Sequence, residues 1–242
     1  MAEAALWGAV GGLALIVGAV VGLRVSMRQR AIGLVMGFGA GVLVSALAFE
    51  LTAEAYNRAG ADAVAIGLTA GSLLFFCGDW VIDRRGGDKR KSSQGEQTEG
   101  APLAIVLGAL LDGIPESAAI GVSLLEGTGV SLAFVAAVFL SNVPESLAAS
   151  AGLQKAGWSV TRVLLLWTGV LAVSALAAAV GYAALGGASP DRIAFVLAFA
   201  AGAILTMLAD TMIPEAFRES GSLVGLVTSA GFTLAFLLST FE

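Results

Sequence analysis

The chain has 242 residues, of which 57% are hydrophobic and 13% are charged. A soluble domain carries roughly 25% charged residues, so this composition excludes a soluble globular protein. The 13 Lys and Arg against 18 Asp and Glu leave a net charge of −5 and form no basic stripe, so nucleic acid is not expected as a partner. Cys77 is the only cysteine, which excludes an intramolecular disulfide and a thiolate metal cluster.

Apolar stretches divided by charges and by Gly, Pro or Ser predict eight membrane-spanning helices, since crossing the hydrocarbon core takes about 20 apolar residues. The N-terminus carries Glu3 and no basic region, so we expect the first stretch to be a span and not a cleaved signal peptide. The expected spans are 4–23, 31–56, 60–82, 102–125, 129–154, 162–185, 191–217 and 220–241. They predict an all-α integral membrane protein in which 1–242 form a single transmembrane domain.

The connections between the expected spans differ in charge. Residues 84–100 are rich in Lys, Arg, Gly, Ser and Gln and form the clearly hydrophilic loop. Of the 13 basic residues, all except Arg58 and Arg192 fall on the same side of the expected membrane as this loop. Lys and Arg favour the cytoplasmic side. We therefore expect a cytoplasmic 84–100 loop, with both termini outside the cell membrane.

The second and seventh expected spans resemble each other when the sequence is shifted by 161 residues. Since the two spans run in opposite directions, the similarity predicts an inverted repeat in which spans 1–3 and 6–8 surround spans 4 and 5. Such repeats are typical of alternating-access carriers, although Ala- and Gly-rich helices also resemble one another by chance. The aligned identities are Phe38 with Phe199, Ala40 with Ala201, Gly41 with Gly202, Leu47 with Leu208, Ala48 with Ala209, Glu54 with Glu215, and Ala55 with Ala216.

Acidic residues inside the fourth and fifth spans are the strongest functional signal. Asp112 and Glu116 lie in span 4 and Glu145 lies in span 5, while no Lys or Arg lies in the middle of any expected span. Each acid costs about 2.5–3.5 kcal/mol at the bilayer centre, so a bound cation or protons must balance the charge. Asp112 and Glu116 are four residues apart, as are Ser141 and Glu145, so each pair projects from one helix face.

Each of these two spans also contains a proline beside its glutamate. Pro115 and Pro144 lack an N–H, which frees the carbonyl groups of Leu111 and Leu140 four residues earlier. Those carbonyls could coordinate a cation, or the prolines could simply bend the helices. The same segments form a second, shorter inverted repeat, since Ile114–Ser117 in span 4 matches Val143–Ser146 in span 5 at a shift of 29 residues.

Further acids lie toward the ends of spans 2 and 7. Glu50 and Glu54 are expected toward the outer end of span 2, and Asp210 and Glu215 toward the inner end of span 7, with Pro214 opening the backbone between them. They could attract or relay cations at the two mouths of a pathway. Glu54 and Glu215 fit interfacial charges equally well, whereas the deeper positions of Glu50 and Asp210 favour a functional role.

Three motifs resemble the ZIP (Zrt-, Irt-like protein) family of metal transporters. The resemblance extends over the whole chain and implies eight spans and import of zinc, iron or manganese toward the cytoplasm, with metal bound between spans 4 and 5 and often as a homodimer. The motifs are Asp112-Gly-Ile-Pro-Glu-Ser117, Ser141-Asn-Val-Pro-Glu-Ser146 and Asp210-Thr-Met-Ile-Pro-Glu-Ala216.

By this resemblance Asp112 takes the place of a usual histidine ligand, and Glu116 and Glu145 match carboxylate ligands of the family. Ser141 and Asn142 fall where the family has further polar ligands. The chain has no histidine at all. An all-oxygen site suits Mg²⁺, Ca²⁺ and Mn²⁺ and also accepts Zn²⁺ or Fe²⁺ with less selectivity; Cd²⁺ is a further candidate.

Two other positions depart from the family pattern. Gly113 replaces a common asparagine, and span 6 offers no carboxylate, although Thr168 could supply a weak oxygen ligand from that span. A second metal site next to the first is therefore not predicted.

The leading prediction is transport of a divalent metal cation, with the bilayer and a second copy of the chain as partners and no cofactor besides the transported ion. The alternative is a proton-coupled carrier of another small solute, with the same acids as a proton relay. A scaffold or receptor leaves the cost of the buried acids unexplained. An enzyme is not expected, since a Ser–His pair is impossible without histidine.

Overall fold

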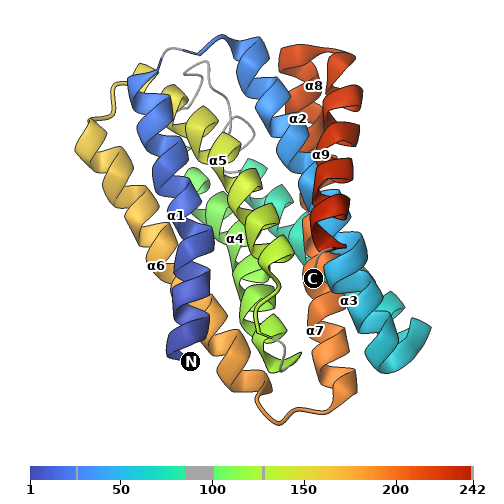
Figure 1. Ribbon diagram of the computed structural model, residues 1–242. Helices are drawn as coiled ribbons and strands as arrows, with labels where there is room; N and C mark the ends of the chain where they lie inside the picture. The colour runs from blue at the N-terminus through green and yellow to red at the C-terminus, as the bar shows by residue number, and fades with distance from the viewer. Residues whose placement is uncertain (26, 85–100, 127–128, 241–242) are drawn as a thin grey trace.

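The computed structural model describes residues 1–25, 27–84, 101–126 and 129–240, and every regular element in these residues is helical (Figure 1). Apart from Arg84, the hydrophilic loop expected at 84–100 lies outside the described residues. The α-helices are α1 (Ala2–Arg24), α2 (Gln29–Ala46), α3 (Ala53–Ile82), α4 (Ala101–Ser123), α5 (Leu132–Lys155), α6 (Val160–Leu185), α7 (Pro190–Met207), α8 (Ile213–Ser220) and α9 (Leu223–Ser239). The shorter elements are the π-helical turns η1 (Leu47–Thr52) and η4 (Leu208–Met212) and the 3₁₀ turn η3 (Leu124–Glu126).

Within the described residues, six continuous helical segments are long and apolar enough to cross a membrane, and the apolar helix α9 is shorter. This confirms the predicted all-α class and fits a membrane protein. The six segments are Ala2–Arg24, Gln29–Ile82, Ala104–Ser123, Leu132–Lys155, Val160–Leu185 and Pro190–Ser220.

The segment Gln29–Ile82 is too long for one crossing. Its 54 residues would extend for about 80 Å as a straight helix, whereas the hydrocarbon core is about 30 Å thick. Gly60 interrupts it with φ 74° and ψ −172°, and Figure 1 shows the chain turning back there, at the lower right of the view. Only glycine adopts this backbone conformation readily, so the tight turn at Gly60 follows from the sequence. Gly221 (φ 68°, ψ −154°) makes the corresponding break between α8 and α9.

Two π-helical turns continue the helices that carry them. The first, η1, joins α2 to α3, and the second, η4, joins α7 to α8. A π-turn widens the helix by one residue and often occurs at functional sites. Glu50 lies in η1 and Asp210 lies in η4.

The helices contact one another in two groups. In the first group α1 packs along α5 and α6, and α4 packs along α6; in the second, α3 packs along α7 and α9 packs along α2. Contacts of α2 with α5 and of α4 with α7 join the groups. Small residues permit the close approach: a Cβ at Gly18 of α1 would clash with the Ser146 side chain of α5. In the first group the buried Trp167 indole N–H also donates to Ser150 Oγ at 2.8 Å, which ties α6 to α5.

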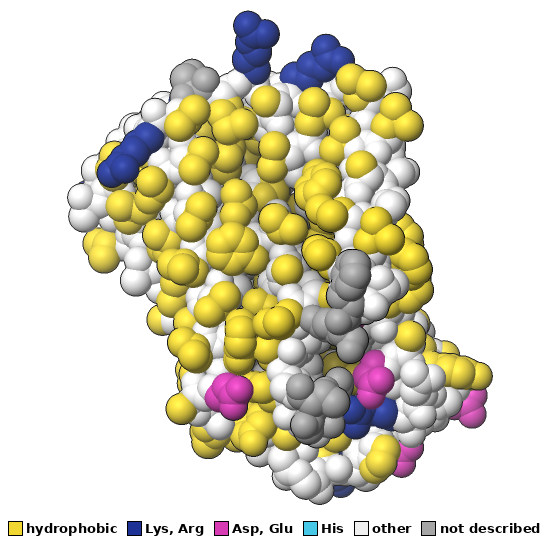
Figure 2. All heavy atoms as spheres, viewed as in Figure 1, with side chains coloured by type: hydrophobic (Ala, Val, Ile, Leu, Met, Phe, Trp, Pro, Cys, Tyr) yellow, Lys and Arg dark blue, Asp and Glu magenta, His cyan; other side chains and the backbone are white. Residues whose placement is uncertain are grey.

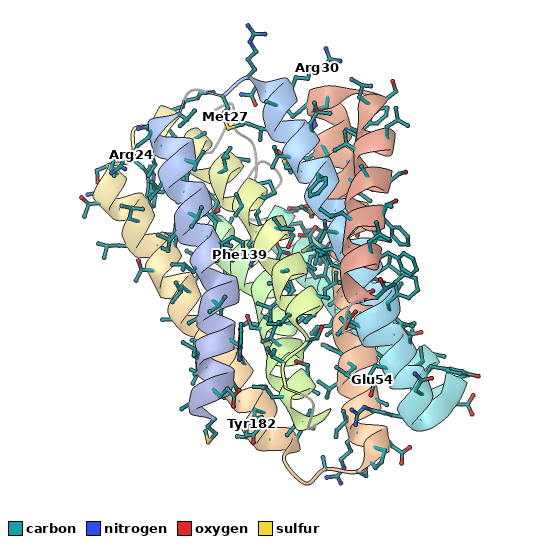
Figure 3. The ribbon with its side chains drawn as sticks, in the orientation of Figure 1. Arg24, Met27, Arg30, Glu54, Phe139 and Tyr182 are labelled. Atoms are coloured by element: carbon teal, nitrogen blue, oxygen red, sulfur yellow. The ribbon has the colours of Figure 1, made fainter. Side chains whose placement is uncertain are left out.

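The surface has an apolar middle and two differently charged ends. Figure 2 shows hydrophobic side chains over the middle, Lys and Arg at the upper end, and mainly Asp and Glu at the lower end. Figure 3 places Arg24 and Arg30 at the upper end and Glu54 and Tyr182 at the lower end. This is the arrangement expected of a protein that crosses a membrane between two charged surfaces.

Candidate functional site

All five residues predicted to bind metal are buried on α4 and α5. The exposed fraction is 4% for Asp112, 1% for Glu116 and 9% for Glu145, and it is 3% for Ser141 and 6% for Asn142. The two motifs therefore turn their polar side chains into the helix bundle and away from lipid. Burial of three carboxylates in this way is unusual, because an ionised carboxylate loses its hydration when it is buried.

On α4 the two acids share the inward face. Asp112 and Glu116 are one turn apart and buried, whereas Ile114 between them is 42% exposed. The helix runs without interruption through Pro115. The proline thus leaves the acids on one face of a continuous helix, as their four-residue spacing predicts.

On α5 the polar side chains of the second motif bond to nearby main-chain oxygens. The Asn142 Nδ2 group donates to Gly11 O of α1 at 3.4 Å, and Ser141 Oγ donates to Val138 O at 2.9 Å. Both contacts use donor hydrogens. The side-chain oxygens of Ser141 and Asn142 thus keep lone pairs that can accept a proton donor or coordinate a cation.

Helix α1 passes close to both motifs. A Cβ at Gly11 would lie 3.3 Å from Ile120 Cδ1 of α4 and 3.4 Å from Val138 Cγ1 of α5. Ile120 is one turn after Glu116, and Val138 is one turn before Asn142. The two motifs therefore adjoin the same stretch of α1.

The start of the second motif also packs against the other group of helices. A Cβ at Gly39 of α2 would lie 3.1 Å from Ser141 Cα, 3.2 Å from Leu140 O and 3.2 Å from Met212 Cε of η4. Pro144 has no N–H to donate to the Leu140 carbonyl four residues earlier. That carbonyl thus faces α2 and the π-helical turn η4. In Figure 3 Phe139, the residue before Leu140, lies about midway between the two ends of the bundle.

The acids predicted at the mouths of the pathway have different environments. Glu54 forms an ion pair with Arg58, with Oε1 2.6 Å from Nε, at the lower end of the bundle. Glu50 Oε2 accepts a hydrogen bond from Ser131 Oγ at 2.8 Å. Asp210, which was expected to lie deeper in its span, is exposed, whereas Glu215, which was expected nearer the membrane surface, is buried with 8% of its surface exposed.

Thr168, the candidate oxygen ligand from span 6, does not face the interior of the bundle. Thr168 is exposed, and its hydroxyl donates to Leu164 O at 2.8 Å within α6. The buried polar residue on this helix is Ser174, which is 5% exposed and whose Oγ would lie 3.7 Å from a Cβ at Gly113. Its helical spacing from the buried Trp167 could have identified it.

Asp79 on α3 is a buried acid that the sequence analysis did not select. It is 8% exposed and lies on the same helix face as the buried Phe75 and Ile82. The signal was present in the sequence, because these three residues follow the spacing of one helix face and Asp79 interrupts an otherwise apolar run.

Within residues 1–25, 27–84, 101–126 and 129–240, no group of three or more His, Cys, Asp or Glu is arranged to hold a metal ion. A cation at the two motifs would therefore need oxygens of other kinds beside carboxylates. Ser141, Asn142 and the Leu140 carbonyl provide oxygens of the hard type that Mg²⁺, Ca²⁺ and Mn²⁺ prefer.

The Ser131–Glu50 hydrogen bond links the two groups of helices and gives a first prediction. Ser131 caps α5, accepting from Phe134 N at 3.0 Å, while Glu50 belongs to the turn between α2 and α3. In a double-mutant cycle of Ser131→Ala and Glu50→Ala, the two effects on unfolding free energy should couple by about 1 kcal/mol. Chemical unfolding of the purified protein in detergent measures the coupling.

Ser159→Ala serves as the control, because Ser159 caps α6 through Arg162 N at 3.4 Å. Loss of a cap alone costs about 0.5–2 kcal/mol in either variant. Coupling with Glu50→Ala should occur for Ser131→Ala and be absent for Ser159→Ala. Equal behaviour of the two serine variants would show that the link between the helix groups contributes nothing.

The resemblance to a transporter family rests on the sequence features described above. A comparison with models of known protein families and with curated proteins finds no match to this chain.

Proposed function

We propose that this protein transports a divalent metal cation of the zinc, manganese or iron class, with Cd²⁺ as a further candidate, between α4 and α5. The proposed ligands are Asp112, Glu116, Ser141, Asn142 and Glu145. The proposal is carried by three buried carboxylates on two apolar helices that have no Lys or Arg near their middle. Three ionised carboxylates of this kind would cost about 8–10 kcal/mol at the centre of a membrane, and a bound metal cation would offset that cost, as would protons.

We further propose eight crossings arranged as an inverted repeat. The breaks at Gly60 and Gly221 are separated by the same 161 residues as the aligned spans 2 and 7, and both glycines have similar φ and ψ angles. The π-turns begin at Leu47 and Leu208, which have the same separation. These coincidences support the repeat because neither backbone feature entered the sequence alignment.

Helix packing supports the same symmetry. A Cβ at Gly71 of α3 would clash with Phe199 O of α7, and a Cβ at Gly231 of α9 would clash with Phe38 O of α2. Phe38 and Phe199 are an aligned pair of the repeat. The last helix of each proposed half thus packs on the middle helix of the other half, and paired halves of this kind are typical of carriers.

In the proposed orientation the upper end in Figure 1 faces the cytoplasm of the cell and both termini face outward. The described basic residues Arg24, Arg30 and Lys155 gather at that upper end, in line with the preference of Lys and Arg for the cytoplasmic side. Net flux would then be import. A homodimer is part of the proposal through the family resemblance.

The second candidate function is a proton-coupled carrier of another small solute. The lack of a three-residue cluster of His, Cys, Asp or Glu in the described part of the chain favours it, because separate carboxylates can relay protons without a shared ion. This carrier would bind its solute in a pH-dependent manner that divalent metals do not compete with.

Calorimetric titration tests the metal site directly. We expect the purified wild-type protein to bind at least one of Zn²⁺, Mn²⁺, Fe²⁺ or Cd²⁺, and Asp112→Asn to weaken that binding by about tenfold or more, because it removes a ligand charge. Asp62→Asn is the matched control, since Asp62 is exposed beside the Gly60 turn. Absence of binding to the wild type, or equal binding by both variants, would contradict the proposed site.

A further inference from the structure

A large apolar groove lies between α3, α4 and α7. Its volume is about 970 Å³, which is within the range of pockets that hold whole small ligands. The side chains that line it are all apolar or Cys, and five large ones are between 37% and 56% exposed. These five are Leu74 and Val81 of α3, Leu107 and Ile114 of α4, and Phe195 of α7.

The groove lies on the reverse side of the helix that carries the first motif. Leu111 and Pro115 line it from α4, whereas Asp112 and Glu116 turn into the bundle. Whatever fills the groove therefore packs directly against the proline turn that positions the two acids.

The positively charged side chain of Arg84 follows the groove-lining residues of α3. Val81 and Ile82 are the last α3 residues in the lining, and the Arg84 guanidinium lies 3.7 Å from the centre of the Trp80 ring. Trp80 is 48% exposed. A Trp with an Arg over its face is suited to the boundary between acyl chains and headgroups.

We propose that this groove binds one phospholipid with an anionic headgroup, whose acyl chain lies between α3, α4 and α7 and whose phosphate contacts Arg84. An apolar groove at membrane depth is filled by hydrocarbon, since water cannot satisfy its hydrogen bonds there. The positive charge at one end distinguishes a bound anionic lipid from bulk lipid. One basic residue near the membrane surface gives about a fivefold preference for such a lipid.

This proposal requires that α3, α4 and α7 lie in a membrane, and it does not depend on metal transport. A bound chain would contact Leu111 and Pro115 and so support the local shape of α4 from its lipid side. Loss of the lipid would then be detected by a probe in the groove whether or not a metal binds at the acids.

The native Cys77 allows a direct test, because it is the only cysteine and is exposed in the lining of the groove. A small fluorophore on Cys77 is placed in vesicles of phosphatidylcholine that contain a minor share of phosphatidylglycerol with brominated acyl chains. We expect quenching that corresponds to about a fivefold enrichment of the brominated lipid over its bulk share. Cys77→Ser with Leu237→Cys is the control, since Leu237 is 51% exposed on α9, and its probe should report the bulk share.

Charge variants test the headgroup contact. Arg84→Gln should reduce the enrichment at Cys77 to the bulk share, and Arg84→Lys should retain it, because the charge persists. Identical quenching at Cys77 and at the Leu237→Cys probe would overturn the proposal, as would an unchanged enrichment in Arg84→Gln. A Cys77 probe that no brominated lipid quenches, with cross-linking between copies at Cys77, would show that a second copy of the chain covers the groove.

Discussion

Replacing Glu116 or Glu145 by glutamine is expected to abolish divalent metal uptake by proteoliposomes while the protein still folds. Glutamine preserves the size of the side chain and removes the negative charge that the proposed transport would use to bind the cation. Since burying each ionised acid costs about 2.5–3.5 kcal/mol, neither variant should unfold more readily than the wild type. A metal-sensitive dye inside the vesicles measures initial rates, which should fall by at least about tenfold.

Glu3→Gln is the matched control, because it makes the same chemical change at an exposed position of α1. Its uptake rate should equal that of the wild type. Wild-type rates in both Glu116→Gln and Glu145→Gln would refute transport through these acids. Loss of metal-independent, pH-driven solute uptake in the same variants would instead identify the proton-coupled carrier.

The second large effect is expected from two alanine substitutions in the helix contacts. Gly41→Ala would press a methyl group into Thr228 O of α9, and Gly202→Ala would press one into Leu68 O of α3. Main-chain atoms of a packed helix cannot move aside as a side chain can, so each variant should lose about 1–3 kcal/mol of stability. Thermal unfolding in detergent should show a lower melting temperature for both.

Gly225→Ala provides the comparison, because a Cβ at Gly225 of α9 meets no atom within 4 Å. Alanine favours the helix by about 0.8–1.0 kcal/mol over glycine, so this variant should be as stable as the wild type or more stable. Equal melting temperatures for Gly41→Ala, Gly202→Ala and Gly225→Ala would contradict this prediction. They would show that the close contacts of α2 with α9 and of α7 with α3 do not stabilise the helix bundle.

Composition and spacing were sufficient for the helical class and for the inward face of the two motifs. Apolar runs of about 20 residues can form little else in a membrane, and the spacing of Asp112 and Glu116 fixes their shared face. The turn at Gly60 was nearly located as well, because the expected spans ended at 56 and resumed at 60. The π-turns were not predicted, since they depend on packing around η1 and η4 and leave no distinct residue pattern.

The polar contacts around the motifs could not be predicted from the sequence. Asn142 bonds to Gly11, which lies 131 residues away in the chain, and such a pairing follows only from how α1 meets α5. Thr168 was selected because it has a hydroxyl group. Which hydroxyl of α6 is buried depends on the helix face that packs against its neighbours, and Ser174 lies on that face. Asp79 could have been identified in the same way, by asking which helix face of α3 is buried.

The packing of α3 on α7, and of α9 on α2, affects how this chain is made. When α3 leaves the ribosome, its partner helix has not yet been synthesised, and at 5–20 residues per second the delay is on the order of ten seconds. During that interval the glycine-lined face of α3 has to be covered by lipid or by the insertion machinery. A chain cut before α7 would therefore contain every residue of the motifs on α4 and α5 and still lack the helix against which α3 packs.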